Sequence, residues 1–280
     1  MNNYQSGVVR PSTPLLTGSK FSKKITLFGL MAAIAVGSVL TSCKKESADA
    51  AAPGLKLNTE KALAPVAGGP ALNLTDATGT VERSSTGNIY TVKNYFVDQG
   101  IYSGTANHRP NGTYYFDFSA NDNKKGATST TEPTSKVWDI SLSGTGNADI
   151  RINTDATEGS AIKFLNQSFA TVIGTYTAAG SGATAWAAGS TSATTPFGHN
   201  RTVATLDYSA DAPAWTIKGW YNYYFANHTL LATDDLTILV EDSNGDVYAL
   251  HMISTYENAT PVGTPPTNYS WLKFEYKKLP

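Results

Sequence analysis

The chain has 280 residues, of which 41% are hydrophobic and 15% are charged, and its formal net charge is −1. The near-neutral charge excludes a strongly basic nucleic-acid binder, and the apolar content excludes a wholly disordered chain. A single cysteine excludes a disulfide framework, a cysteine-rich zinc site and an iron–sulfur cluster.

The N-terminus is predicted to be a lipoprotein signal peptide. A segment with three lysines precedes the uncharged run from Ile25 to Leu40, which is 16 residues long and therefore shorter than the ~20 residues that span a bilayer. The run ends in Leu-Thr-Ser-Cys, which resembles a bacterial lipobox. We expect residues 1–42 to be removed and Cys43 to carry the lipid anchor. A plain signal peptide with an incidental cysteine is the alternative.

The segment after the lipobox is predicted to be a tether. Residues 1–42 contain four basic residues and no acidic one, so the mature chain has a formal charge of −5. Such a chain does not hold anionic lipid head groups by charge, and the lipid itself must anchor it. Residues 43–78 begin with Lys-Lys-Glu-Ser after the cysteine and continue in a stretch rich in Ala, Pro and Gly, which favours a flexible linker. We place the folded domain at residues 79–280.

The remainder of the chain is predicted to be all-β and antiparallel. Short runs of β-branched and aromatic residues are separated by turn signals, and no window has a helical period of useful length; residues 161–172 come closest. The predicted strands are 88–97, 113–118, 136–143, 148–153, 161–165, 202–208, 214–225, 236–241, 246–256 and 268–277. Alternation predicts that Phe116 is buried with Phe118, and Trp138 with Ile140 and Leu142.

Two connecting segments carry specific predictions. Residues 242–246, Asp-Ser-Asn-Gly-Asp, contain the Asn-Gly pair typical of a hairpin turn; a calcium loop would need a downstream Glu that is missing. Residues 175–196 are mostly Ala, Gly, Ser and Thr, and we expect a long loop, a length that favours binding or disorder. Its Trp186 either packs on a sheet edge or contacts a ligand.

We expect no enzymatic activity. The chain contains no nucleophile elbow, no His-Glu-x-x-His motif, no P-loop and no dinucleotide-binding glycine motif. Lipidation of Cys43 removes the one candidate cysteine nucleophile. Carboxylate pairs such as Asp234-Asp235 stand in turn-like sequence, where solvation is expected.

The histidines of the mature chain are the remaining candidates for chemistry. His108 lies in a turn-rich loop where solvation is expected. His251 and Met252 are neighbours in a predicted strand, so they point to opposite faces and cannot share a ligand without a bulge. For His251 we expect partial burial and a hydrogen bond, although both residues remain alternative ligands.

His199 and His228 stand at the ends of predicted strands beside aromatic sequence. Imidazoles held by a rigid sheet suit axial haem ligation, and aromatic rings suit the porphyrin faces. The aromatic residues expected in such a pocket are Trp186, Trp220 and Tyr224. Ordinary solvated surface histidines are the alternative.

Several short motifs carry a family resemblance over roughly residues 85–279. They are Tyr-Tyr-Phe-Asp-Phe at 114–118, Val-Trp-Asp-Ile at 137–140, Ile-Arg-Ile-Asn-Thr at 150–154, Gly-Trp-Tyr-Asn-Tyr at 219–223, the strand and turn at 236–246, Val-Tyr-Ala-Leu at 247–250 and Trp-Leu-Lys-Phe-Glu-Tyr at 271–276. With the signal and lipobox, these motifs resemble the HmuY family of Bacteroidota haem-binding lipoproteins. One departure is Asn153-Thr154-Asp155, where the family usually has Asn-Gly-Gly.

The resemblance implies a hand-like β fold in which loops bring two axial haem ligands together. By position in the motif order, His228 matches the second ligand, just past the Trp-Tyr strand, and His199 is the histidine available for the first. Some relatives use methionines, which Met252 alone cannot supply as a pair. No metal other than haem iron is implied.

The expected function is therefore that of a surface lipoprotein that scavenges haem and delivers it to an outer-membrane receptor. The patch after Cys43 resembles surface-export signals of Bacteroidota lipoproteins, which places the protein on the outer membrane at the cell surface, with release by proteolysis left open. Expected partners are haem, host haemoproteins, a TonB-dependent receptor and the membrane, but no nucleic acid; homo-oligomerisation is also left open. The alternative function is binding of a glycan or a host protein through an aromatic β platform.

Overall fold

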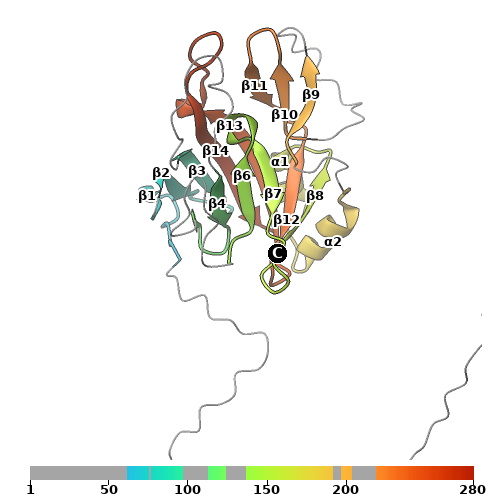
Figure 1. The fold of residues 1–280 in the computed structure, drawn as a ribbon. Helices are drawn as coiled ribbons and strands as arrows, with labels where there is room; N and C mark the ends of the chain where they lie inside the picture. Colours follow the sequence, from blue (N-terminus) through green and yellow to red (C-terminus); the bar gives the residue numbers. More distant parts are fainter. Residues whose placement is uncertain (1–61, 76, 97–112, 124–136, 192–196, 204–218) are drawn as a thin grey trace, which may run out of the picture. The chain divides into compact units, whose positions relative to one another are not determined.

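The computed structural model describes residues 62–75, 77–96, 113–123, 137–191, 197–203 and 219–280. These ranges contain fourteen strands and two short α-helices, with almost all strand pairs antiparallel, so the predicted all-β class is confirmed (Figure 1). Residues 1–42, Cys43 and His108 lie outside the described ranges. Along the described parts of the chain, no helix has the length and apolar character needed to cross a membrane.

The largest sheet has seven strands in the order β1-β2-β3-β14-β13-β12-β8, all paired antiparallel. Its strands are β1 (Leu72–Asn73), β2 (Thr78–Arg83), β3 (Tyr90–Phe96), β8 (Ala161–Leu165), β12 (Thr237–Glu241), β13 (Val247–Tyr256) and β14 (Tyr269–Lys278). Both faces of this sheet are covered. Along β13, Tyr248 and Leu250 belong to one hydrophobic cluster while Val247 and Ala249 belong to another, as the alternation of a strand requires.

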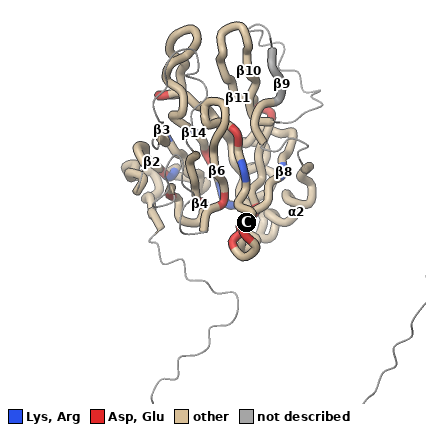
Figure 2. The backbone as a smooth tube through the Cα atoms, viewed as in Figure 1, with Lys and Arg blue, Asp and Glu red and all other residues tan. Residues whose placement is uncertain are grey.

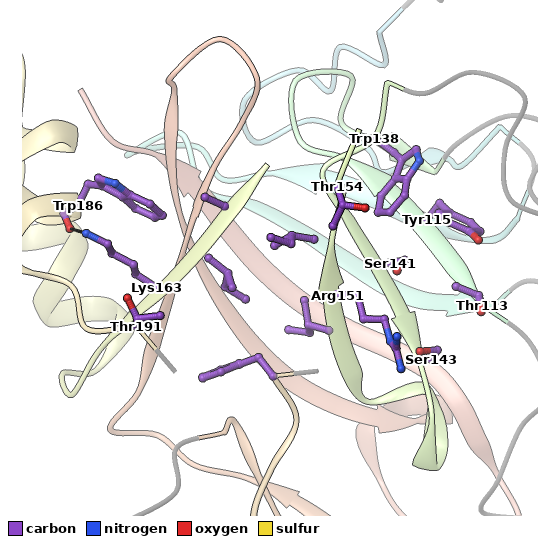
Figure 3. A pocket seen from close by; sticks show the side chains of 15 residues that line it. Thr113, Tyr115, Trp138, Ser141, Ser143, Arg151, Thr154, Lys163, Trp186 and Thr191 are labelled. Carbon is purple, nitrogen blue, oxygen red and sulfur yellow. Dashed lines mark hydrogen bonds between the residues drawn. The ribbon is translucent and has the colours of Figure 1, made fainter. Parts of the chain in front are cut away.

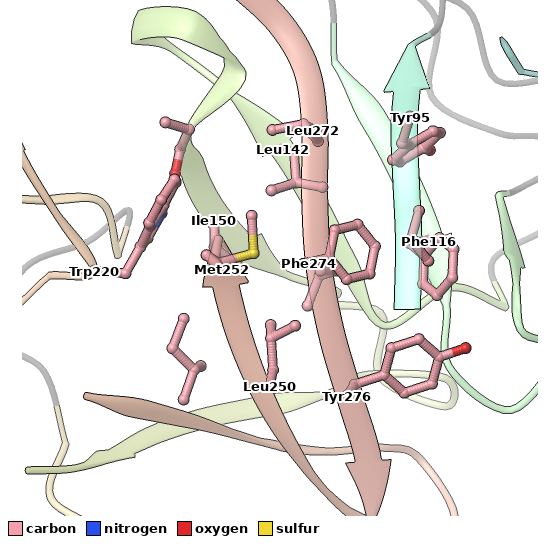
Figure 4. Packing of buried hydrophobic residues seen from close by; sticks show 14 of the residues in the cluster. Tyr95, Phe116, Leu142, Ile150, Trp220, Leu250, Met252, Leu272, Phe274 and Tyr276 are labelled. Atoms are coloured by element: carbon pink, nitrogen blue, oxygen red, sulfur yellow. The ribbon is translucent and has the colours of Figure 1, made fainter. Parts of the chain in front are cut away.

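A four-stranded antiparallel sheet packs on one of these faces. It has the order β5-β4-β6-β7 and consists of β4 (Tyr114–Asp117), β5 (Asp122–Asn123), β6 (Ile140–Ser143) and β7 (Asp149–Ile152). Between the two sheets, the Phe116 and Phe274 rings meet edge to face with centroids 5.1 Å apart. Figure 4 shows the same layer of buried side chains, with Leu142 and Ile150 near Met252 and Leu272. This layer is the main core.

The third sheet has three strands in the order β11-β10-β9. Strand β9 (His199–Val203) runs parallel to β10 (Tyr221–Tyr224), and β11 (Thr229–Ala232) pairs with β10 antiparallel. The indole Nε1 of Trp220 donates a hydrogen bond to the carbonyl of Ala148, at 2.5 Å, and thereby ties this sheet to the start of β7.

Two helices cover the second face of the large sheet, and here the sequence prediction was wrong. Helix α1 (Phe169–Thr175) is capped by Ser168, whose Oγ accepts from the Thr171 N–H at 3.3 Å. Helix α2 (Ser181–Ala188) interrupts the expected loop at 175–196. Gly and Thr weaken the helical signal of α2, but Ala185 is fully buried against the sheet and the Gly182 N–H donates to the carbonyl of Pro280 at 2.7 Å. Contacts with distant parts of the chain therefore stabilise α2 as a helix.

The predicted tether extends too far along the chain. Within residues 62–75, β1 pairs with β2, the side chain of Leu74 is buried, and the Leu63 N–H donates to the carbonyl of Ala120 at 2.8 Å. The folded region therefore begins before residue 79. Ala and Gly tolerate the close backbone contacts made here, which the composition alone does not distinguish from a linker.

The burial predicted for Phe116, Phe118, Trp138 and Ile140 is confirmed, but the predicted face of Trp138 is wrong. Ile140 and Leu142 face the main core, whereas Trp138 packs against Tyr115 on the other face, with ring centroids 5.0 Å apart. The chain bends at Asp139, whose Oδ2 accepts from the Phe118 N–H at 2.7 Å, and this bend shifts the alternation.

Most other predicted strands lie within a few residues of the observed ones, and the hairpin turn at 242–246 is confirmed. In that turn, the Asn244 and Asp246 N–H groups donate to Asp242 Oδ1 at 2.9 and 2.8 Å, and Gly245 has a left-handed φ of 81°. Strand β9 begins at His199 rather than at 202, so His199 is part of a strand.

Candidate functional site

His199 is exposed at the first residue of β9. It pairs with Tyr221 of β10, and the two rings lie 6.0 Å apart between centroids. The preceding Phe197 is fixed by two backbone hydrogen bonds to Ile150 of β7, at 2.9 and 3.0 Å. Strand β7 therefore determines where the imidazole of His199 lies.

Asp149 of β7 lies beside His199. Its Oδ1 accepts a hydrogen bond from the Tyr221 hydroxyl at 3.0 Å. Burial raises the pKa of the Asp149 carboxyl, while the Tyr221 hydrogen bond and the positive charges of His199 and Arg151 act in the opposite direction. A Cβ on Gly198 would lie 1.9 Å from Asp149 Oδ1, so only glycine permits this approach.

His228 occupies the turn between β10 and β11. Its backbone is left-handed, with φ of 57°, and its ring nitrogen Nδ1 is hydrogen-bonded to the Tyr223 hydroxyl. The Tyr269 hydroxyl donates to the His228 carbonyl. The half-buried ring lies 5.8 Å from that of Phe225, which is 63% exposed.

His199 and His228 stand at opposite ends of the same strand, β10. His199 is level with Tyr221 at one end of β10, and His228 follows Tyr224 at the other end. Three strand steps of about 3.3 Å place the two positions about 10 Å apart along β10. Because each imidazole reaches several ångströms beyond its own backbone, this spacing is compatible with one axial histidine or with two.

The alternative ligands His251 and Met252 point to opposite faces, as their adjacency in β13 predicts. The His251 ring stacks on Phe169 of α1, and its Nδ1 is 2.9 Å from Glu275 Oε1. Its Nε2 is buried and has no hydrogen-bond partner within the described part of the chain. The Met252 side chain is 1% exposed in the main core, where it is not accessible to a ligand.

The three aromatic residues expected to hold the porphyrin lie in different surroundings. Trp220 and Tyr224 are buried, at 2% and 0% exposure, and Trp220 is part of the main core. Trp186 of α2 is half-buried and lines a cleft. Among the three, Trp186 presents ring surface to a ligand.

This cleft of about 840 Å³ lies between the edges of β7 and β8, and sequence reasoning missed it. In Figure 3, Trp186 and Lys163 lie on one side, and Trp138, Tyr115 and Arg151 lie on the other. Apolar side chains also line it: Ile150, Ile152, Ala161, Ile162 and Phe197. The volume is within the range of small-molecule sites, about 300 to 1,000 Å³.

Charge and hydroxyl groups surround the apolar part of the cleft. Lys163 Nζ donates to the carbonyl of Trp186 at 2.9 Å and lies 4.6 Å from the centre of its ring. The lining hydroxyls belong to Thr113, Ser141, Ser143, Thr154 and Thr191. Charged residues are otherwise sparse along the described backbone, as Figure 2 shows. The available sequence signal was a single cation flanked by apolar residues in each strand, Arg151 in β7 and Lys163 in β8.

No group of three or more His, Cys, Asp or Glu side chains that could hold a metal ion occurs in the described ranges. The described groups that could contact a ligand are therefore individual imidazoles, and the two cations and the hydroxyls that line the cleft.

Comparison with known proteins gives one distant likeness. No protein-family model and no curated protein matches the chain. Among solved structures, the chain is similar to a protein from Bacteroides vulgatus ATCC 8482 described as a candidate HmuY-like haem-binding protein. The two share 15% sequence identity, the match covers 67% of this chain and 90% of the other, and the TM-score is 0.34. A TM-score this low decides neither the family nor the ligand of this chain.

Proposed function

We propose that this protein is a lipid-anchored surface protein that binds haem without catalysing a reaction, with His199 as the axial ligand. The observation that carries the proposal is the exposed imidazole of His199 beside the Asp149 carboxylate. Metal-ligating histidines are typically oriented by a neighbouring carboxylate, which also raises their basicity. The sequence motifs that resemble haem-binding lipoproteins support the same ligand.

The proposal gives His228 a different role from the one expected. His228 lies at the far end of β10, and its ring is half-buried whereas that of His199 is exposed. We therefore assign one axial histidine, His199, and use His228 as the matched control.

Hemin titration of the chain from Lys44 onward tests this assignment. We expect the wild type and His228→Ala to give the same Soret band, and His199→Ala to bind hemin weakly with a shifted band. Binding should weaken at acidic pH, because a protonated imidazole cannot coordinate iron. A wild type without a Soret shift would end the haem proposal, and an equal loss in both variants would restore ligation by two histidines.

The lipid anchor is tested separately. Cys43→Ala should leave unprocessed precursor or soluble protein, because the lipobox cysteine is the lipidation site. Partitioning into a detergent phase measures the anchor; partitioning that is unchanged in the variant contradicts it. In this proposal the anchored protein takes haem, including haem from host haemoproteins, and delivers it to a TonB-dependent outer-membrane receptor.

A further inference from the structure

We propose that the cleft between β7 and β8 is a binding site for a short acidic oligosaccharide, separate from the His199 site. The proposal rests on three features of the cleft: two cations that form no ion pair within the described ranges, hydroxyls that make no side-chain hydrogen bond there, and an apolar and aromatic lining. None of them involves a histidine.

The cations Arg151 and Lys163 stand on the two strands that border the cleft. Neither forms an ion pair with any acidic residue in the described ranges. Asp149, on the same face of β7 as Arg151, accepts a hydrogen bond from Tyr221 instead. A ligand carboxylate would therefore supply the missing partner, and guanidinium–carboxylate hydrogen bonds are among the stronger ones in proteins.

The hydroxyls of Thr113, Ser141, Ser143, Thr154 and Thr191 make no side-chain hydrogen bond to another described residue. They line the same cleft as the two cations. Each hydroxyl both donates and accepts, which matches the hydroxyls of a sugar. A ligand with many hydroxyls and at least one carboxylate satisfies both sets of groups.

The lining suits the rings of a saccharide. Trp186 forms one wall and Tyr115 with Trp138 forms the other (Figure 3). The indole Nε1 of Trp138 is buried and has no hydrogen-bond partner among the described residues, although Trp138 is 6% exposed. Apolar and aromatic walls with a few placed polar groups are the usual composition of a small-ligand site.

An extended peptide fits this cleft less well. Peptides that add to a sheet need a free strand edge. Here Ile150 of β7 is already bridged to Phe197, and Phe164 of β8 is bridged to Ser190. The edges that border the cleft are therefore partly occupied by the chain itself.

Calorimetric titration of the chain from Lys44 onward tests the proposal. The probes are trigalacturonate, a heparin tetrasaccharide and 3′-sialyllactose, with methyl-esterified trigalacturonate as the uncharged counterpart. We expect at least one acidic probe to bind, and the matching uncharged form to bind at least tenfold more weakly. Arg151→Gln and Lys163→Gln should each weaken binding about tenfold, the effect of losing one charge-assisted hydrogen bond.

Lys277→Gln is the matched control, because Lys277 lies on β14 outside the cleft and loses the same charge. It should bind the acidic probe like the wild type, and near-ultraviolet circular dichroism should show all three variants folded. Binding of none of the acidic probes, or equal binding of the esterified one, overturns the proposal. It is also overturned if the two cleft variants weaken hemin binding, since the cleft would then be the haem site.

Discussion

The β9–β10–β11 sheet and the cleft between β7 and β8 satisfy their polar groups in opposite ways. In the sheet, Tyr223 and Tyr269 engage His228, and Tyr221 engages Asp149 beside His199. In the cleft, Arg151 and Lys163 form no ion pair within the described ranges, although Lys163 Nζ donates to the carbonyl of Trp186. A polar group that the protein already pairs is held in place, whereas a cation without a paired acid is available to a ligand carboxylate. The sheet therefore orients a few groups, and the cleft leaves its two cations open to a ligand.

The largest expected effect separates a structural tryptophan from a ligand-facing one. Trp220→Ala should lower the free energy of unfolding by about 3 to 5 kcal/mol, because the ring is buried and its Nε1 ties the sheet to Ala148. Trp186→Ala should cost less, about 1 to 2 kcal/mol, because the ring is half-buried and packs only in part against the hydrophobic cluster beneath the helices. Urea unfolding measures both. Equal losses would show that Trp186 is mainly a packing residue.

The second effect concerns the support of His199. Gly198→Ala should lower stability by about 1 to 3 kcal/mol and weaken hemin binding, because the new Cβ would displace the Asp149 carboxylate. Gly174→Ala in α1 is the control, since a Cβ there meets nothing within 4 Å. It should leave hemin binding unchanged and raise stability slightly. Full hemin affinity in Gly198→Ala would show that Asp149 does not position His199.

The third effect is a pH-dependent change in stability that comes from the buried carboxyl of Asp139. Burial raises the pKa of Asp139 well above its usual value, the charges of Asp117 and Asp242 raise it further, and the hydrogen bond from the Phe118 N–H acts against them. The folded state therefore favours the protonated carboxyl, and stability falls as pH rises from the unfolded pKa of about 3.9 through the folded pKa.

Asp139→Asn removes this titration while keeping an acceptor for the Phe118 N–H. We expect the variant to be more stable than the wild type at pH 7, by about 1.4 kcal/mol for each unit by which the pKa is raised, and equally stable near pH 3. Thermal melts across this pH range measure the difference. A stability difference between Asp139→Asn and the wild type that does not grow as the pH rises would contradict the direction of the shift.

The smallest effect tests the alternative ligand. His251→Ala should leave the Soret band and hemin affinity unchanged, because His251 packs on Phe169 and pairs with Glu275 away from both sites. The free energy of unfolding of the variant should fall by about 1 kcal/mol, the usual cost of losing a partly buried hydrogen bond. A lost Soret band would make His251 the axial ligand.

The local sequence was sufficient to predict most strands, because their signal comes from neighbouring residues. Alternation in 246–256 and 268–277 predicted the two long central strands, and Asn244-Gly245 predicted the turn before β13. The same local reasoning placed Met252 and His251 on opposite faces. It also gave the lipobox at Cys43, which stays a prediction outside the described residues.

Only the tertiary structure decided how distant segments meet. Helix α2 has little intrinsic preference for its conformation and depends on contacts of Ala185 and Gly182 with remote residues. The bend at Asp139 turned Trp138 to the opposite face, and the pairing of β9 with β10 placed His199 at the end of β10 opposite to His228. The cleft arises because β7 and β8 belong to different sheets. Such placements depend on contacts between residues far apart in the chain, which the spacing of residues within one strand does not encode.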